Sequence, residues 1–215
     1  DVCSSDLRVG DTDSVPYDEG PRASRVTYTE GEAVMRACVV IKQAIADGVA
    51  LPHTVTIEHT AEEREDITYF GAQVAKVYVD RETGHVDVLQ LTTAHDVGTI
   101  INPLAHQGQI DGGVSTGFSL SVTEEFVTDD GQVLNESMAD YKLPTIADMP
   151  PLETVLIQAG GGTGPYEAKA IGELANNAIA AATANAAADA VGCRRFELPT
   201  NAERVYQAIR SNGST

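Results

Sequence analysis

The sequence is poor in cysteine, tryptophan and basic residues. Its 215 residues include three cysteines, no tryptophan, and 14 Lys and Arg against 32 Asp and Glu. The formal charge of −18 disfavours nucleic acid and anionic membranes as partners, because both reward Lys and Arg. Cys3, Cys38 and Cys193 lie far apart without CxxC spacing. A disulfide framework, a zinc site or an iron–sulfur cluster ligated by this chain is therefore not expected.

Long apolar segments are missing as well. No run approaches the roughly 18 apolar residues of a membrane span, and the beginning of the sequence lacks the basic and apolar regions of a signal peptide. We therefore expect a cytoplasmic protein. Residues 1–7, DVCSSDL, resemble the translation of one reading frame of a common sequencing-adapter oligonucleotide. We expect this stretch to be foreign, residues 8–215 to form one truncated domain with two lobes, and an upstream portion to be missing.

Apolar residues make up 42 % of the chain, enough for a sizeable core. Their spacing predicts helices, strands and turns along the sequence. Helices are expected over residues 31–46, 178–191 and 201–209, the last with Asn201 as N-cap. A hairpin is expected from strands 74–79 and 86–91, a second one over 126–134, and a further strand over 152–157. Because the strands mix with helices without strict βαβ alternation, we predict an α+β fold with mixed sheets.

A glycine-rich loop leads into the predicted Ala-rich helix through GGGTGPYEAKAIGE, which ends at Glu173. At or just before the first helical turn, the Glu173 carboxylate would be stabilised by free backbone N–H groups and the helix dipole. Such a carboxylate suits a general base. The alternative is a helix-capping glutamate without chemistry. A phosphate-binding P-loop is disfavoured, because Lys169 is followed by Ala170 and no GK[ST] occurs.

Two further segments carry polar groups that could bind a cofactor or an anion. NPLAHQGQIDGG places Gln109 among glycines, and a glutamine amide can both donate to and accept from the polar edge of a cofactor. The alternative is a solvated side chain in a turn-rich connection. Four glycines, at positions 108, 112, 113 and 117, indicate close approach of the backbone to another group. RASRVT offers hydroxyls and backbone donors that suit an anion, or ordinary N-capping by Thr27 or Thr29.

Histidine and serine patterns give no further site. The five histidines are scattered without HExxH spacing, so a metal ion ligated by side chains is not expected. Residues 113–117, GVSTG, match the GxSxG nucleophile elbow, but no histidine follows His106 to complete a triad. We interpret this match as chance.

Six segments in order resemble the molybdopterin-binding large subunit of the xanthine dehydrogenase and aldehyde oxidase family of molybdenum hydroxylases. The segments are GDTDSVPYDEG…ASRVT, FGAQVAKVYVDRETGHVDVLQ, HDVGTIINP…GQIDGG, ADYKLPT, GPYEAKAIGE and ELPTNAERV. The resemblance covers nearly all of the chain from Val9 to Ile209, and it places the chain in the C-terminal part of that subunit.

The resemblance implies an oxidoreductase that hydroxylates an aldehyde or an N-heterocyclic carbon with water as oxygen source. It implies a molybdenum–molybdopterin cofactor, in the cytosine dinucleotide form, whose metal is held through the pterin and not by the protein. Electrons would leave through 2Fe-2S and FAD domains or subunits of an oligomeric parent enzyme. Glu173 would be the catalytic base, and the residues expected to contact the cofactor are Ala23, Ser24, Arg25, Val26, Thr27, Gln109, Ile110 and Gly172.

The sequence also departs from the family's pattern. The family often has KGVGEPP where this chain has KAIGELANN, so Ala170 replaces a common glycine and the loop after Glu173 differs. The stretch between Gly48 and Tyr69 looks shorter than in many relatives. Two alternatives stay open: an inactive, cofactor-free fragment of such an enzyme, and a non-catalytic interaction module of the same fold.

Overall fold

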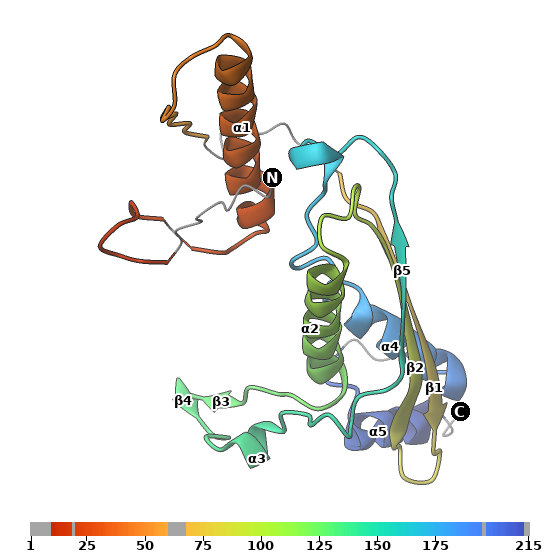
Figure 1. Ribbon diagram of the computed structural model, residues 1–215. Helices are drawn as coiled ribbons and strands as arrows, with labels where there is room; N and C mark the ends of the chain where they lie inside the picture. Colours follow the sequence, from red (N-terminus) through yellow and green to blue (C-terminus); the bar gives the residue numbers. More distant parts are fainter. Residues whose placement is uncertain (1–9, 19, 60–67, 195–196, 213–215) are drawn as a thin grey trace.

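The computed structural model describes residues 10–18, 20–59, 68–194 and 197–212. A three-stranded sheet forms the body, two helices cover one of its faces, and a third helix projects from the body as an arm (Figure 1). Residues 1–7, which the sequence indicates to be foreign, lie outside the described part of the chain.

The sheet is mixed, as predicted. Its strands β1 (Gly71–Val79), β2 (Val86–Asp96) and β5 (Leu152–Ile157) lie in the order β1-β2-β5. β1 pairs with β2 antiparallel, whereas β2 pairs with β5 parallel. The structure confirms the predicted first hairpin and the strand over 152–157. Both hairpin strands extend beyond their predicted bounds at the end away from the turn, where Gly71 pairs with His95.

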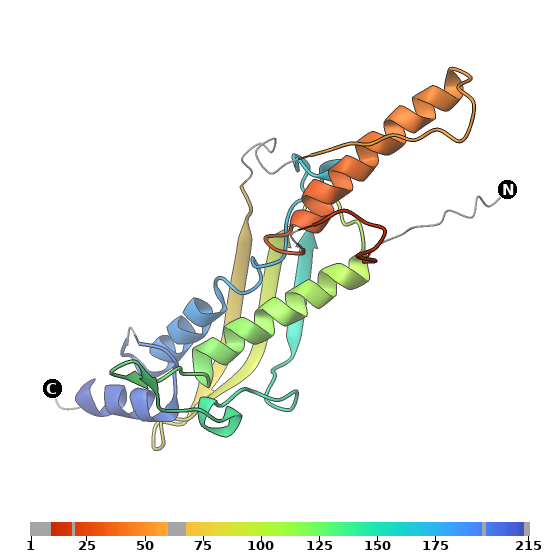
Figure 2. The same ribbon diagram turned by 90° about the vertical axis from the view of Figure 1, so that its left-hand side faces the viewer.

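Helices α2 (Pro103–Val122) and α4 (Ile179–Val191) pack side by side on one face of the sheet (Figure 2). Asn102 caps α2 by accepting a hydrogen bond from the Ala105 N–H at 3.1 Å, and Pro103 occupies the first turn. The two helices and the sheet enclose the main core. Its buried members are Leu91, Val97, Ile110, Val114, Phe118, Ile171, Ala175 and Ile179.

The glycines of α2 bring its backbone against the segment that leads into α4. A Cβ at Gly113 would lie 2.8 Å from the Ala175 Cβ, and one at Gly117 would lie 2.8 Å from the Ile179 Cβ. The expected close approach is therefore confirmed at these two positions. The expected close approach is wrong for Gly108 and Gly112, which lie on another side of the helix. A Cβ added at either position would have no atom within 4 Å.

Helix α1 (Gly31–Ala46) has the predicted bounds and continues from a π-helical turn, η1 (Val26–Glu30). Its main contacts are with η1 and with the short 3-10 turn η3 (Pro165–Glu167). No residue of α1 is buried, so the arm stands away from the sheet (Figures 1 and 2). The apolar face expected from its sequence is therefore exposed within the described part of the molecule, with Val34 and Val39 each 61 % accessible.

The other predicted elements are present. The second hairpin, β3 (Thr128–Asp129) with β4 (Gln132–Val133), turns at Asp130 and Gly131 with φ of 45° and 80°. After α3 (Met138–Tyr141), β5 and α4, the last element of the described residues is α5 (Ala202–Asn212). Asn201 caps α5 as predicted, because its Oδ1 accepts from the Arg204 N–H at 3.0 Å.

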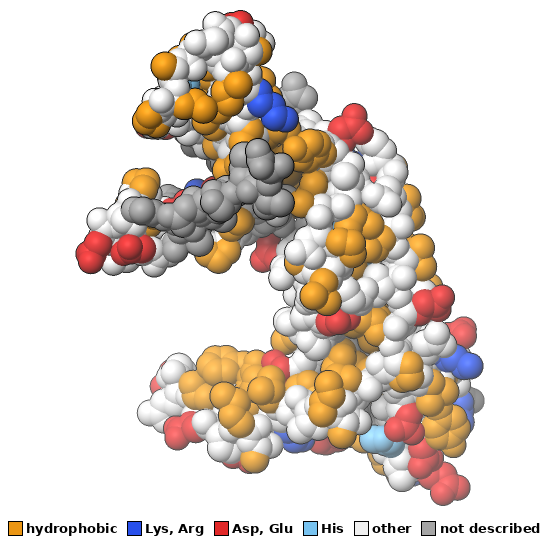
Figure 3. Space-filling view, in the orientation of Figure 1, with side chains coloured by type: hydrophobic (Ala, Val, Ile, Leu, Met, Phe, Trp, Pro, Cys, Tyr) orange, Lys and Arg blue, Asp and Glu red, His pale blue; other side chains and the backbone are white. Residues whose placement is uncertain are grey.

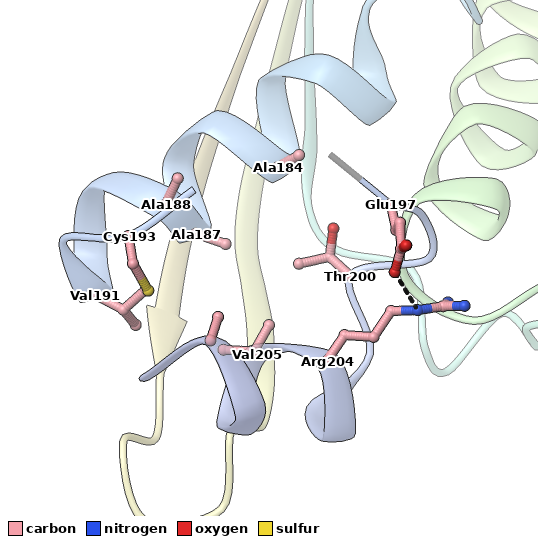
Figure 4. A pocket seen from close by; sticks show the side chains of 10 residues that line it. Ala184, Ala187, Ala188, Val191, Cys193, Glu197, Thr200, Arg204 and Val205 are labelled. Carbon is pink, nitrogen blue, oxygen red and sulfur yellow. Dashed lines mark ion pairs between the residues drawn. The ribbon is translucent and has the colours of Figure 1, made fainter. Parts of the chain in front are cut away.

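Helices α4 and α5 meet in a second, smaller core. Its buried side chains are Val79, Ala187, Val191 and Val205. Figure 4 shows the gap between these helices, where the Cys193 side chain lies beside alanines of α4 and where Arg204 pairs with Glu197. The gap holds about 30 Å³, which is room for about one or two waters. It is therefore a packing defect of the core.

The sheet face opposite α2 and α4 is open to solvent in the described residues. Its exposed apolar side chains are Val74, Tyr78, Leu89, Val155 and Ile157. Within the part of the chain that the structure describes, no helix is long and apolar enough to cross a membrane.

Candidate functional site

A cavity of about 610 Å³ opens between the segment that precedes α1, the first turns of α2 and the loop before α4. Figure 2 shows the segment before α1 beside the N-terminal end of α2, and Figure 3 shows the concave outline between the upper part of the molecule, which carries the arm, and its lower part. The residues that line the cavity are Pro21–Tyr28, Ile101, Asn102, Ala105, His106, Gln109 and Ala168–Glu173.

All site residues predicted from the sequence except Ile110 line this cavity. Residues 23–27, Gln109, Gly172 and Glu173 come from three segments that are far apart in the sequence. Ile110 is fully buried in the main core with Val114. Its side chain therefore packs against the helices and sheet and does not reach the cavity.

Gly172 is the point at which the three segments meet. Its backbone N–H donates a hydrogen bond to the Ser24 Oγ at 2.9 Å. A Cβ at position 172 would lie 2.9 Å from that oxygen and 3.9 Å from the Gln109 Oε1, so only glycine fits without displacing Ser24. Ala23 and Ser24 hold left-handed backbone conformations, with φ of 46° and 58°, which are costly for residues with a Cβ.

The alternative role for this first segment, N-capping by Thr27 or Thr29, is wrong. Both threonines lie inside η1, and neither the start of η1 nor that of α1 has a side-chain cap. η1 runs into α1 as one continuous helical path, so the hydroxyls do not mark a helix start.

Lys169 and Asp96 anchor the loop before α4 to the sheet. The Lys169 Nζ lies 2.6 Å from the Asp96 Oδ2, with side chains only 7 % and 10 % exposed. Hydrogen bonding from Lys169, helped by the Gly98 N–H, lowers the pKa of Asp96 below its ordinary value. The Lys169 N–H also donates to the Val97 carbonyl at 3.0 Å. The lysine is thus engaged by a carboxylate, which agrees with the rejection of a P-loop.

Glu173 does not lie at the start of a helix, contrary to the prediction. It belongs to a run of turns over residues 172–178, and α4 begins only at Ile179. The N–H of Ala178 at the helix start is capped by the Gln73 Oε1 at 2.8 Å, so helix capping by Glu173 is wrong too. Glu173 is exposed and lines the cavity, which leaves its carboxylate accessible to a bound molecule.

His106 is a cavity residue that the sequence reasoning missed. It lies one helical turn before Gln109 on α2 and lines the same cavity. Burial lowers its pKa, which keeps the ring neutral at pH 7, and its Nε2 has no hydrogen-bond partner among the described residues. The i, i+3 spacing would have indicated a shared face had this glycine-rich segment been recognised as helical.

The cavity fits a large polar group. Its volume lies within the roughly 300–1,000 Å³ of small-molecule sites. Gln109 and His106 supply polar groups from α2, and Glu173 supplies a carboxylate from the loop before α4. Among the described residues, no three His, Cys, Asp or Glu side chains form a metal-binding group. Ser115 of GVSTG donates to the Gly112 carbonyl within α2, so it forms no nucleophile elbow.

Comparison with known proteins identifies the family. The model of the molybdopterin cofactor-binding domain matches residues 47–150. The putative xanthine dehydrogenase molybdenum-binding subunit of Escherichia coli K12 is 28 % identical over 97 % of this chain and 34 % of its own length. A probable xanthine dehydrogenase subunit of Bacillus subtilis is 32 % identical over 67 % of this chain and 19 % of its own length.

Two solved structures resemble this fold. The Cu,Mo-CO dehydrogenase matches with a TM-score of 0.82 and 24 % identity over 95 % of this chain and 32 % of that one, a likeness that concerns the fold. The aldehyde oxidoreductase from Desulfovibrio gigas matches with a TM-score of 0.61 and 32 % identity over 66 % of this chain and 15 % of that one. The chain spans about a third of the first relative's length. It belongs to the molybdopterin-binding large subunits of the xanthine dehydrogenase and aldehyde oxidoreductase family.

Proposed function

We propose that this chain forms part of a molybdenum hydroxylase that inserts oxygen from water into an aldehyde or N-heterocyclic carbon, with Glu173 as the general base. One observation supports this most strongly: the cavity gathers Glu173, Gln109 and residues 23–27 from three distant segments. The molybdenum–pterin cofactor, when bound, supplies the two-electron oxidation of the substrate.

The residues of the chain have separable tasks in this proposal. Glu173 accepts the proton of the attacking oxygen, which requires a carboxylate within hydrogen-bond reach of that oxygen. Gln109 offers one donor and one acceptor to a polar edge of the cofactor. Ser24 holds Gly172 at 2.9 Å, which fixes the backbone beside the base.

The remaining parts of the enzyme are proposed from the same family membership. The cofactor is in the cytosine dinucleotide form, and residues 23–27 lie along it. Electrons pass to 2Fe-2S and FAD domains or subunits in an oligomeric, cytoplasmic enzyme. A nicotinate dehydrogenase subunit of Pseudomonas putida is 34 % identical over 67 % of this chain. Its name refers to an N-heterocyclic compound, which supports this substrate class.

The test is Glu173→Gln in the full-length enzyme, with molybdenum and pterin measured per subunit. Positioned general bases contribute about 10²–10⁴ in rate, so we expect at least a hundredfold loss of turnover with cofactor content unchanged. Glu167→Gln is the matched control, because Glu167 is exposed in the same loop but does not line the cavity. A loss smaller than about tenfold in the fully loaded Glu173→Gln enzyme would refute the role.

A further inference from the structure

Gln73 is a polar side chain on the inward face of β1. The residues that follow on this face, Ala75, Val77 and Val79, are apolar and pack against the cores. Gln73 is half-buried and lies opposite Thr93 of β2 in the sheet register. A half-buried amide in such a position needs hydrogen-bond partners, and the partners that it has lie beside the candidate base.

Both ends of the Gln73 amide bind the turns that follow Glu173. The Nε2 donates to the Ala175 carbonyl at 2.6 Å, and the Oε1 accepts from the Ala178 N–H at 2.8 Å. The amide therefore bridges a carbonyl and an N–H that lie two and five residues after Glu173. The Ser24 bond to Gly172 holds the residue before Glu173. The backbone that carries Glu173 is thus held on both sides by side chains from elsewhere in the fold.

The Gln73 amide also contacts a polar pair within the sheet. Its Nε2 also donates to the Thr93 Oγ1 at 3.2 Å, and that oxygen lies 2.5 Å from the His95 Nε2. Burial lowers the pKa of His95, so its ring is neutral and its Nε2 can accept the Thr93 hydroxyl proton. Turning the amide over would set its oxygen against the Ala175 carbonyl oxygen and its NH2 group against the Ala178 N–H, so both of these hydrogen bonds would be lost.

We infer that Gln73 is a positioning residue for Glu173. Its hydrogen bonds to Ala175 and Ala178 fix the run of turns that holds the Glu173 carboxylate in the cavity. This inference rests on the proposed role of Glu173. Gln73 does not line the cavity, so it acts through the backbone between Gly172 and Ala178. The Ala175 carbonyl and the Ala178 N–H set the orientation of the amide, and Thr93 accepts a further bond from it.

The first variant is Gln73→Met in the full-length enzyme, which keeps the side-chain length and removes all three hydrogen bonds of the amide. We expect kcat to fall by about tenfold or more, since a misplaced reacting group is costly, while KM and cofactor content change less than about threefold. Amide hydrogen exchange over residues 174–179 should quicken. Gln90→Met is the control, because Gln90 lies on the paired strand and bonds Glu153, away from these turns.

The second variant, Gln73→Glu, separates positioning from folding. Its ionised carboxylate can still accept from the Ala178 N–H but would repel the Ala175 carbonyl, whereas its protonated form can donate to that carbonyl as the amide does. Burial among neutral groups raises the pKa of a carboxyl. We therefore expect the ratio of variant to wild-type kcat to rise severalfold as the pH is lowered from 8 to 6. A role confined to folding would leave this ratio flat.

The outcomes distinguish the inference from the proposal on which it rests. Unchanged kcat in fully loaded Gln73→Met would overturn the positioning role, even with faster amide exchange. If Gln73→Met loses cofactor or fails to fold, the pH dependence of Gln73→Glu decides, and a flat ratio overturns the inference. Full activity in Glu173→Gln would instead refute the proposed base. Faster amide exchange in Gln73→Met would then still show that the Gln73 hydrogen bonds hold the turns after Glu173.

Discussion

The Ser24 Oγ accepts a hydrogen bond from the backbone N–H of Gly172, a residue 148 positions further along the chain. This contact joins the segment before α1 to the loop that carries Glu173. It closes one wall of the cavity, and the absence of a side chain at position 172 lets the two backbones approach.

Loss of the Ser24 hydroxyl should weaken the enzyme without unfolding it. A single neutral hydrogen bond contributes about 1 kcal/mol, which corresponds to about fivefold in an equilibrium or a rate. We expect Ser24→Ala to lower turnover of the full-length enzyme by about that factor, measured per molybdenum atom. Ser115→Ala is the control, because its hydroxyl bonds only the Gly112 carbonyl within α2. Equal effects of the two substitutions would contradict a role for the Ser24 contact.

Two glycines of α2 should respond to alanine with opposite signs. At Gly117 the added methyl would lie 2.8 Å from the Ile179 Cβ and 3.0 Å from the Asn176 carbonyl oxygen, so Gly117→Ala should lower the free energy of unfolding by about 1–3 kcal/mol. At Gly112 nothing lies within 4 Å. Gly112→Ala should raise the unfolding free energy by about 0.5–1 kcal/mol through helix propensity. Urea unfolding followed by circular dichroism measures both, and a stabilising Gly117→Ala would show that the helices are not in close contact.

The buried Lys169–Asp96 pair predicts a stability effect that depends on pH. Lys169→Met leaves Asp96 buried without its partner, which should cost about 3–5 kcal/mol of unfolding free energy at pH 7. Since Lys169 lowers the pKa of Asp96, the pair stabilises the wild type above the unfolded pKa of about 3.9, and this contribution is lost as the pH falls through the lower folded pKa. In the variant, burial raises the Asp96 pKa, so protonation relieves the cost at higher pH.

The difference between wild type and Lys169→Met should therefore shrink from pH 7 to pH 4, as measured by urea unfolding at each pH. Asp87→Asn removes an exposed pair with His85 and serves as the comparison, with an expected effect below about 1 kcal/mol. If the loss of unfolding free energy in Lys169→Met stays constant or grows toward acid pH, the unpaired Asp96 carboxylate is not its cause.

The sequence predicts those parts of the fold whose pattern is local. The bounds of α1 and β5 follow directly from apolar spacing and alternation, and the Asn201 cap from residue type and position. The pattern does not predict helix α2, because four glycines, each costing about 1 kcal/mol in a helix, disguise its period. Only the packing against Ala175 and Ile179 explains two of those glycines, and such packing is not visible in a single chain segment.

The candidate site was likewise predicted only in part from the sequence. The order of motifs predicts that residues 23–27, Gln109 and Glu173 belong together, and the structure places them around one cavity. Residues that act through distant contacts were missed, because Gln73 and Ala178 are 105 positions apart and Asp96 and Lys169 are 73 apart. The available signal was a glutamine on the otherwise apolar inward face of β1. The local structure predicted for Glu173 is wrong although the helix start at 178 was predicted to within one residue, because a run of turns over residues 172–178 separates Glu173 from α4.

The close contact between α2 and the start of α4 has a consequence for motion. Because the backbones meet at Gly113 and Gly117, α2 and the segment before α4 cannot slide past each other without separating these contacts. Residues 21–28 line the same cavity and continue through η1 into α1, and the Ser24 bond to Gly172 ties them to the loop of Glu173. A tilt of the projecting helix large enough to widen the cavity would therefore have to break that hydrogen bond.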